Sequence, residues 1–413
     1  MQRLYLFPAM VCLVLFGLLT SPAYAWVNDT PAGASQCGAT DVNNNGTLIM
    51  NCKVSNASVT DVVLSGGGTV QLAPLPTTAG GVPCASGAIN NAPAGQETII
   101  GSCNDGNNVS QAVVWNTAQP GSPLQLMPWN GLLGIIGNGV TTGATGVNLQ
   151  GIVIGVSTDA NGTDMPVYWA GGSNVATALN APLLAQQANC APSDINDAKT
   201  PSIVGNCPGA GGKNVAVLWP TLSAPYSVLP VPGGASYCMA AQINLNGQIL
   251  GECIYGTDTH RATIWGSGGT GPTVLQTING NQALRTVGVS QSDAGLVAVN
   301  FLAGGAQAGF YEPAVWNPAS GTNAPSIALP SGSIRGTVGG IGNNGKAVGN
   351  FETAAGDVHS FHIEPNSLTA VDDGAPAGGP NAAVTALSTS GVWMADTAEN
   401  SNKDAQAEVQ QTP

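Results

Sequence analysis

Eight hexapeptides align when the chain is read from end to end: Thr47–Cys52 (TLIMNC), Thr98–Cys103 (TIIGSC), Ile152–Ser157 (IVIGVS), Ser202–Cys207 (SIVGNC), Gln248–Cys253 (QILGEC), Leu296–Phe301 (LVAVNF), Lys346–Phe351 (KAVGNF) and Val392–Thr397 (VWMADT). Their first residues are separated by 51, 54, 50, 46, 48, 50 and 46 residues. Because chance does not keep a spacing near 50 through eight copies, the sequence predicts a repeat architecture.

Each hexapeptide follows a turn signal. Glycine immediately precedes six of the eight copies, at Gly46, Gly151, Gly247, Gly295, Gly345 and Gly391. Asn or Ser usually stands a few places earlier, and both Asn and Gly tolerate the positive φ of a tight hairpin turn. The fourth position of the hexapeptide is Gly in five copies and small in two more, Val299 and Ala395. A strand that drops its side chain at one position usually lets another backbone come close.

Two further blocks follow each hexapeptide. The first ends in Trp in five copies, at Trp115, Trp169, Trp219, Trp265 and Trp316, and is degenerate at 62–64 and 361–363. The second runs toward Pro, at 70–74, 124–128, 228–232 and 327–330. With the lead-in segment, each unit therefore holds four short β-rich segments, and no stretch keeps a helical period.

Four antiparallel strands in about 50 residues are typical of one blade of a β-propeller. We predict an all-β propeller domain over residues 26–398, with eight blades favoured and seven blades plus a spare terminal hairpin as the alternative. In the eight-bladed form the last blade borrows a strand from the mature N-terminus near Trp26–Gln36. Residues 399–413 form a polar C-terminal tail that could contribute a closing strand. A parallel β-helix is disfavoured because turn-linked units imply antiparallel pairing.

The cysteines support this hairpin arrangement. Without Cys12, eight remain, in four sequence-close pairs: Cys37/Cys52, Cys84/Cys103, Cys190/Cys207 and Cys238/Cys253. Each pair places one Cys at the start of the lead-in strand and the other at position six of the hexapeptide. Antiparallel pairing brings these two ends within disulfide reach, so we predict four disulfides within units. The C-x₂-C spacing of a zinc or redox site is absent.

The unit Ile-Asn-x-x-Gly-x-Ile-x-Gly, followed by Ala-x-x-Trp and Leu-Pro, resembles the extracellular HAF-repeat family of bacterial secreted proteins. The resemblance covers residues 37–397, although Ala, Pro or Ser stands where family units tend to read His-Ala-Phe, and the cysteines are additional. It implies export and a repeat fold and supplies no activity.

The first 25 residues predict an export signal. Met1–Ala25 has Arg3, an apolar stretch over 10–19 and the small residues Ala23 and Ala25 of an A-x-A cleavage site. No segment has the roughly 20 uninterrupted apolar residues of a spanning helix. We therefore expect a secreted, extracellular or periplasmic monomer without a membrane span.

Composition argues against a nucleic-acid partner. Lys+Arg number 9 against 22 Asp+Glu, for a formal net charge of −13. So few basic residues cannot form a stripe that neutralises phosphates.

Chemical signatures are few. No G-x-S-x-G elbow, H-E-x-x-H helix or P-loop occurs, and three His residues leave a Ser-His-Asp triad short of partners. The segment 41–46 resembles the start of a calcium loop, but Cys52 stands where the bidentate acid is needed. The segment 159–164 offers clustered oxygens for a cation, and His359 and His362 would point to opposite faces of a strand. We assign no catalytic residue, metal or cofactor.

Geometry nominates one face for binding. The turns between strands one and two are short and rich in Asn and Gly, whereas those between strands two and three emerge at the other end with the blade-to-blade connections. We predict that this second, long-loop face carries the ligand, because variable loops on a rigid scaffold usually hold binding sites. The candidate residues there are Asp105, Asp159, Asp258, His260, Arg261, Tyr311, Asp357 and His359.

The sequence thus leads to three functional hypotheses. The favoured one is a secreted, non-enzymatic propeller scaffold that binds a glycan or protein partner on its long-loop face. The second is a propeller-type hydrolase or lyase that acts on polysaccharide with acids from several blades. The third is a cell-surface structural or adhesion protein without a defined pocket.

Overall fold

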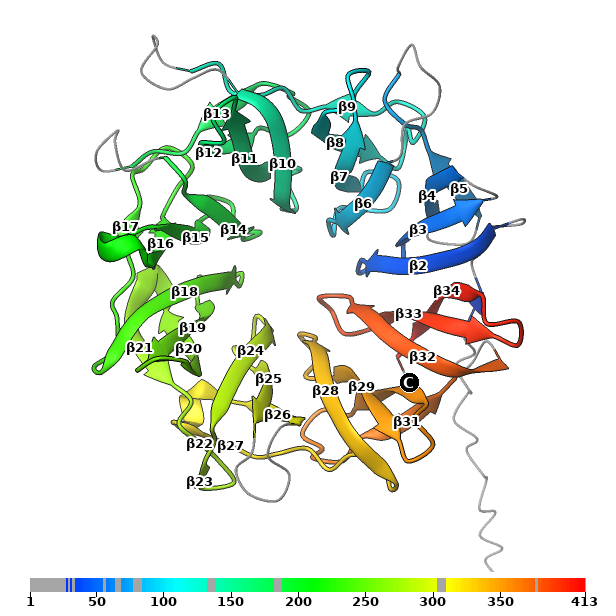
Figure 1. The fold of residues 1–413 in the computed structure, drawn as a ribbon, viewed down its shortest axis with the longest axis vertical. Coiled ribbons are helices and arrows are strands. Elements are labelled where there is room, and N and C mark those ends of the chain that lie inside the picture. Colours follow the sequence, from blue (N-terminus) through cyan, green and yellow to red (C-terminus); the bar gives the residue numbers. More distant parts are fainter. Residues whose placement is uncertain are drawn as a thin grey trace, which may run out of the picture.

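The computed structural model describes residues 27–28, 30–31, 34–54, 57–63, 68–76, 84–131, 139–181, 188–302, 310–375 and 378–412. The predicted export signal, Met1–Ala25, lies outside these residues. Eight antiparallel sheets stand around a ring in Figure 1, in the order of the chain. The predicted all-β propeller is confirmed. We number each sheet, or blade, by the hexapeptide copy that it contains.

The first strand of each blade lies nearest the centre of the ring (Figure 1). These strands are β2 Ala34–Val42, β6 Cys84–Ile89, β10 Gly139–Val147, β14 Ala191–Ile195, β18 Ala235–Ile243, β24 Arg285–Gln291, β28 Ser333–Ile341 and β32 Gly378–Leu387. The second strands carry the hexapeptides: β3 Leu48–Val54, β7 Thr98–Asn104, β11 Val153–Asp159, β15 Ile203–Pro208, β19 Ile249–Tyr255, β25 Val297–Leu302, β29 Ala347–Thr353 and β33 Trp393–Asn400.

The third strands carry the Trp block. They are β4 Ala57–Val63, β8 Ser110–Asn116, β12 Asp164–Trp169, β16 Asn214–Trp219, β20 Thr259–Gly266, β26 Tyr311–Trp316, β30 Val358–Ile363 and β34 Ala405–Gln411. The fourth, outer strands are β5 Thr69–Leu72, β9 Leu124–Gln125, β13 Ala176–Ala178, β17 Ser227–Val228, β21 Thr270–Val274, β31 Val371–Gly374 and, in blade eight, β1 Val27–Asn28.

Blade six departs from the four-stranded pattern. Its sheet has three strands, and the outer strand is replaced by an isolated bridge between Ala314 and Ser326. A small separate sheet lies beside it, with β22 Thr277–Ile278 between β23 Asn281–Gln282 and β27 Asn323–Ala324. Short 3-10 turns complete the described elements: η2 Ala210–Gly212, η3 Ser267–Gly269 and η4 Pro318–Ser320. No helix among the described residues has the length and apolar character to cross a membrane.

The two ends of the chain meet in blade eight. β34 lies within the stretch predicted as a polar tail, and it pairs antiparallel with β33 on one side and with β1 on the other. Val27 and Asn28 oppose Val409 and Glu408. This is the N-terminal contribution that the sequence predicted for an eight-bladed ring, and β2 of blade one lies beside β32 of blade eight (Figure 1).

The hexapeptide glycines fulfil their predicted role. A Cβ atom at Gly251 would lie 2.0 Å from the carbonyl oxygen of Met239 on the neighbouring inner strand and 2.9 Å from the ring of Trp265. Gly101 and Gly205 have the same surroundings. The missing side chain therefore lets the inner strand and the Trp ring approach the second strand together.

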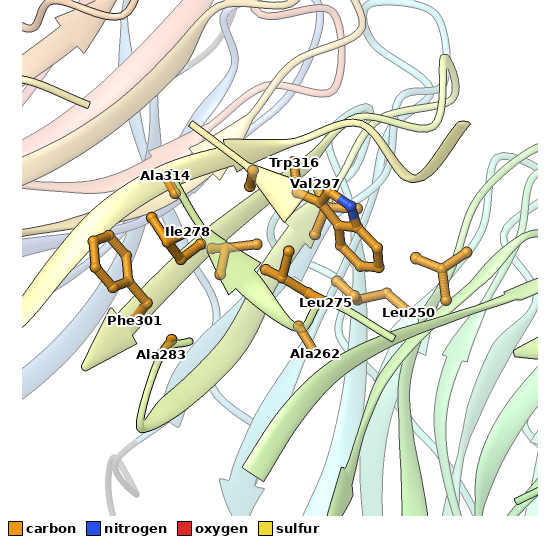
Figure 2. Packing of buried hydrophobic residues seen from close by; sticks show 12 residues of the cluster. Leu250, Ala262, Leu275, Ile278, Ala283, Val297, Phe301, Ala314 and Trp316 are labelled. Carbon is orange, nitrogen blue, oxygen red and sulfur yellow. The ribbon is translucent and has the colours of Figure 1, made fainter. Parts of the chain in front are cut away.

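The tryptophans join successive blades. All five Trp-block indoles are fully buried, and that of Trp316 lies among Val297 of its own blade and Leu250 and Leu275 of blade five (Figure 2). In the other four, the indole N–H donates to a backbone carbonyl in the segment that follows the fourth strand of the preceding blade, as from Trp115 to Ala73 over 2.7 Å. Packing against the preceding blade thus satisfies the polar atom of these four buried indoles, while Trp316 donates to Gly321 O in its own blade.

The four predicted disulfides are present: Cys37–Cys52, Cys84–Cys103, Cys190–Cys207 and Cys238–Cys253, with Cα atoms 4.0 to 4.2 Å apart. Three of them join the first and second strands of one blade, and Cys190 lies one residue before the first strand of blade four. The sulfurs face the preceding blade, since Cys238 and Cys253 pack with Val204 and Leu218 of blade four.

The eighth hexapeptide was placed one residue too early. Asp396 opposes Val384 just before the bulge in β32, as Met50 opposes Ala39 in blade one. The structural copy is therefore 393–398, with Asp396 rather than Ala395 at position four and Ala398 rather than Thr397 in the place of the cysteine. Val392 is an extra residue in the preceding turn. The turn of blade eight is closed by a hydrogen bond from Ser388 N–H to Trp393 O, five residues apart, whereas that of blade one is closed from Asn43 N–H to Thr47 O, four residues apart.

Candidate functional site

The antiparallel strand order gives the ring two different ends. The turns between first and second strands form the short-turn face. The turns between second and third strands, with the connections to the next blade, form the long-loop face. All six glycines that precede hexapeptides have φ between 71° and 84°, so the short turns adopt the conformation that the Asn-Gly pattern predicted.

A central hollow of about 350 Å³ opens on the short-turn face, where sequence reasoning placed no site. Its walls are the last residues of the inner strands and the turns that follow them. Four carboxylates line it, those of Asp41, Asp194, Asp197 and Asp293, and no Lys or Arg is among the lining residues. The face judged structural from its short turns therefore holds the acidic centre of the ring.

Asp41 and Asp194 occupy the same position in blades one and four. Each follows a β-bulge in its inner strand and accepts two backbone N–H groups. Asp41 accepts from Val42 at 2.9 Å and, across the blade boundary, from Ile89 at 3.0 Å. Burial raises the pKa of Asp41 to about 6 and that of Asp194 to about 7, although the N–H bonds act in the opposite direction.

The same position is polar in two further blades. Gln242 accepts from the N–H of Gln291 at 3.1 Å, and Ser290 accepts from that of Ile341 at 3.4 Å. These groups each bond to the inner strand of the next blade, as Asp194 does with Ile243 at 2.8 Å. The polar groups around the hollow therefore hold neighbouring blades together.

A relay of asparagines surrounds the hollow. The Oδ1 atom of Asn43 accepts N–H groups from Asn45 and Thr47 within its own turn, and its Nδ2 donates to Asn90 O in the next blade. The donation repeats over 2.9 to 3.3 Å from Asn90 to Asn148, Asn148 to Asn196, Asn196 to Asn244 and Asn244 to Ser292. The asparagines that predicted turns thus also link six consecutive blades.

The segment 41–46, which resembles the start of a calcium loop, forms one of these asparagine-capped turns. Asn43 caps its own turn, while the Asp41 carboxylate points to the neighbouring blade. Within the described part of the chain, no group of three His, Cys, Asp or Glu side chains is arranged to hold a metal ion.

Two of the predicted long-loop acids cap their own turns. Asp105 Oδ1 accepts from the N–H groups of Asn107 and Val109 at 2.8 and 3.0 Å, and Asp159 Oδ1 accepts from Asn161 and Thr163 at 2.8 Å. These backbone N–H bonds lower the pKa of both carboxyls. The segment 159–164 thus uses its principal carboxylate oxygen within the turn.

The structure brings Asp258 and His260 together. His260 Nε2 lies 3.0 Å from Asp258 Oδ1, and its Nδ1 lies 2.9 Å from Glu252 Oε2. His359 is elsewhere, with its Nδ1 3.1 Å from Asp372 Oδ1 and its ring edge-on to Phe351. Asp357, in the β29–β30 turn, donates its backbone N–H to Thr353 Oγ1 at 3.2 Å. The histidines are therefore each paired with acids of their own blade and share no site.

Tyr311 lines a hollow of about 340 Å³ between blades six and seven, with Phe310, Phe351 and Arg335. Arg335 forms an ion pair with Glu352 and lies 5.6 Å from the centre of the Phe310 ring. Its charge is therefore already neutralised within the protein.

Arg261 lines a different pocket, of about 560 Å³, at the long-loop end of blade five. The walls come from the β19–β20 turn and from the connections on either side of the blade. Tyr255 supplies an aromatic ring, Thr259 and Thr277 supply hydroxyls, and Gln276 and Gln282 supply amides. The remaining lining residues, Gly233, Gly256, Val274 and Gly280, include no acid. Burial raises the pKa of Tyr255, and Arg261 is only 8% exposed.

Sequence reasoning missed one further charged cluster, at the boundary of blades seven and eight. Ser360 Oγ donates to Asp396 Oδ2 at 3.0 Å, and His362 Nδ1 lies 2.6 Å from Asp373 Oδ1. Burial raises the pKa of Asp373, and it raises that of Asp396 to about 6, with the Asp373 charge adding to the effect. The one-residue error in the eighth copy concealed Asp396, which replaces a glycine.

No known family model matches this chain, and no curated protein matches it. Solved structures do resemble it. A prolyl endopeptidase is similar over 82% of this chain and 50% of its own, with a TM-score of 0.56 and 10% identity. A puromycin hydrolase is similar over 92% of this chain and 58% of its own, with a TM-score of 0.51 and 12% identity. This chain thus spans about half the length of each of these two enzymes.

A third similar structure is the β-propeller domain of the Trilobed protease from Pyrococcus furiosus, with a TM-score of 0.48 and 8% identity. It is matched over 94% of its length and 80% of this chain. At such identities the likenesses concern the fold alone.

Proposed function

We propose that this chain is an exported, non-enzymatic β-propeller scaffold that binds a glycan or protein partner on its long-loop face. The observation that carries the proposal is the pocket of about 560 Å³ at the end of blade five, which we call the blade-five pocket. Its volume lies in the range of small-ligand sites, and it combines one aromatic ring with several hydrogen-bonding side chains. Of the other predicted residues of this face, Asp105, Asp159 and Asp357 take part in turns, and Asp258 and His260 pair with each other. His359 pairs with Asp372, and Tyr311 lines the separate hollow between blades six and seven.

Export is part of the proposal. The A-x-A pattern at Ala23–Ala25 and four disulfides support it, because disulfides persist in oxidising compartments. Membership of the HAF-repeat family remains a proposal that rests on the repeat motif alone.

The test is binding of the mature chain, residues 26–413, to a glycan array and to a peptide library. Gln282→Trp places a large ring at the exposed rim of the blade-five pocket, and Leu245→Trp is its matched control on the exposed short-turn face. We expect Gln282→Trp to weaken binding at least about tenfold and Leu245→Trp to leave it unchanged. Unchanged binding by Gln282→Trp, no binding by the parent chain, or turnover of a bound glycan would each overturn the proposal.

A further inference from the structure

We infer that Arg261 makes the blade-five pocket a site for a sugar acid, in which the guanidinium pairs with the carboxylate of a uronic-acid residue in the glycan. This inference rests on the proposed function and names the ligand class for that same pocket. The pairing is non-covalent, a charge-assisted contact of the kind that a planar guanidinium makes with a planar carboxylate.

Arg261 is a buried charge without a counter-charge. Its Nη1 atom is inaccessible to solvent and has no hydrogen-bond partner, and Arg261 takes part in no ion pair within the described ranges. Two other cations of the protein have carboxylate partners. Arg335 pairs with Glu352, and the buried Lys346 pairs with Glu364 at 3.2 Å. Arg285 also has a partnerless Nε and forms no ion pair, but it is only half-buried. Among the described residues, Arg261 is therefore the buried cation that lacks a counter-charge.

An unpaired buried guanidinium is costly, because desolvation disfavours the charged form. Burial lowers the pKa of Arg261 accordingly. The nearby Tyr255 phenol, whose pKa burial raises, is neutral at pH 7 and supplies no counter-charge there. No acid among the pocket-lining residues can remove the cost. A ligand carboxylate would do so, since it would bring the missing counter-charge to the side of the guanidinium that lines the pocket.

The rest of the wall favours a sugar over a peptide. The hydroxyls of Thr259 and Thr277 and the amides of Gln276 and Gln282 match ring hydroxyls in number and type, and Tyr255 offers a surface for a sugar ring. The formal net charge of −13 repels polyanions at long range, so the site suits a single carboxylate rather than a densely charged chain.

The experiment compares D-glucuronate with D-glucose, which differ by a carboxylate in place of a hydroxymethyl group. Binding to the mature chain is measured by calorimetry and by the shift in melting temperature. Three variants are needed: Arg261→Met removes the charge, Arg261→Lys keeps it without the planar fork, and Lys199→Met removes one exposed charge from the short-turn face as a matched control.

We expect D-glucuronate to bind the parent chain at least about tenfold more tightly than D-glucose. Arg261→Met should abolish this preference, Arg261→Lys should retain part of it, and Lys199→Met should keep all of it. Arg261→Met should also melt at the same or a higher temperature than the parent, because it removes an uncompensated buried charge. A lower melting temperature would instead make Arg261 a structural residue and overturn the inference.

Salt provides an independent readout. Raising NaCl from about 50 to about 300 mM screens the long-range repulsion from the acidic surface more than it screens a buried pair. The affinity for D-glucuronate should therefore hold steady or rise, and a steep fall would contradict the inference.

Two further outcomes separate this inference from the proposed function. If array ligands lose binding on Gln282→Trp but not on Arg261→Met, the pocket binds a ligand and the sugar-acid assignment is wrong. If glutamate-containing peptides compete for the site of the parent chain as effectively as D-glucuronate does, the bound carboxylate belongs to a peptide. The assignment of a glycan ligand is then wrong.

Discussion

In blade two the interior is made of isoleucine, valine and a tryptophan around a disulfide, whereas in blade eight it is made largely of alanine and buried polar groups. Ile99, Val113 and Trp115 are completely buried in blade two. The places of Cys103 and Trp115 are taken in blade eight by Ala398 and Gln410. Asp396, Glu408 and Gln410 are buried there as well.

The difference follows the chain around the ring. Blades one, two, four and five carry disulfides, whereas blade three and all of blades six to eight carry none. Blade eight instead depends on strand exchange, because its outer strand β1 comes from the other end of the chain. We call blades one to five the stapled arc and blades six to eight the closing arc. Local opening should begin in the closing arc, since none of its blades has a disulfide cross-link.

The largest effect is expected from breaking the stapled arc at its glycine. Gly251→Ala should destabilise the protein by about 3 kcal/mol, because the new Cβ would lie 2.0 Å from Met239 O and the inner strand would have to shift. Urea unfolding followed by tryptophan fluorescence measures this. Gly143→Ala is the matched control, since its Cβ would meet only Val156 at 3.6 Å, an ordinary contact. Equal losses in both variants would show that the close approach at Gly251 is not the cause.

Removing one disulfide should make blade five resemble the closing arc. Cys238→Ser with Cys253→Ser opens a loop with a sequence separation of 15 residues. On the chain-entropy model, the loss in the free energy of unfolding is about 3 kcal/mol. Hydrogen exchange should rise in β18 and β19 before it rises in blades one and two.

The converse variant adds a disulfide to blade eight. Ala382 opposes Ala398 at the register held by Cys37 and Cys52 in blade one, and both alanines are buried. Ala382→Cys with Ala398→Cys should form a cystine and slow exchange in β32 and β33. If both thiols still react with iodoacetamide after oxidation, the corrected register of the eighth copy is wrong.

The register of the eighth copy marks the limit of sequence reasoning. Three sequence features were enough to predict the propeller, the disulfides and the N-terminal strand in blade eight. These features are the period of the repeat, the asparagines of the turns and the cysteine pairs. The last copy was misplaced because it has neither a cysteine nor a Trp block to mark its register, so Val392 went unnoticed as an insertion. The acidic hollow was missed because Asp41 and Asp194 lie in different units, and only ring closure brings them to one opening.

Arg261 was among the predicted residues, but nothing in the sequence distinguished it from Asp258 or His260. Arg261 differs from them because it has no acidic partner. That can be seen only in the fold, where three segments meet at the end of blade five and none of them brings a carboxylate into the pocket. The signal for inter-blade bonds was present and unused. Position five of the hexapeptide is Asn at Asn51, Asn206, Asn300 and Asn350.

Acidity should strengthen the closing arc. The pKa of Asp396 is raised to about 6 in the folded protein, so folding favours the protonated form. The contribution of protonated Asp396 to the free energy of unfolding is complete below about pH 4 and is lost as the pH rises through 6. At pH 8 the free energy of unfolding of Asp396→Asn should therefore exceed that of the parent by on the order of 2–3 kcal/mol, as measured by urea unfolding. Near pH 4 the two proteins should be equally stable. Asp357→Asn, at a half-buried carboxyl of which only the backbone N–H is hydrogen-bonded, is the control and should change the urea midpoint little at either pH.

The smallest effect concerns the seam between blades six and seven. Asn300 Nδ2 donates to Val338 O at 2.9 Å and its Oδ1 accepts from Val338 N–H at 2.9 Å, so one amide satisfies both backbone groups of a buried residue. Asn300→Ala leaves both groups unpaired and should cost about 1–2 kcal/mol, measured by the urea midpoint. Ser102 holds the same position in blade two but is exposed, so Ser102→Ala should change the midpoint little. If the two variants lose equally, the Asn300 bonds to Val338 do not stabilise this seam, and they are no polar substitute for the missing disulfides.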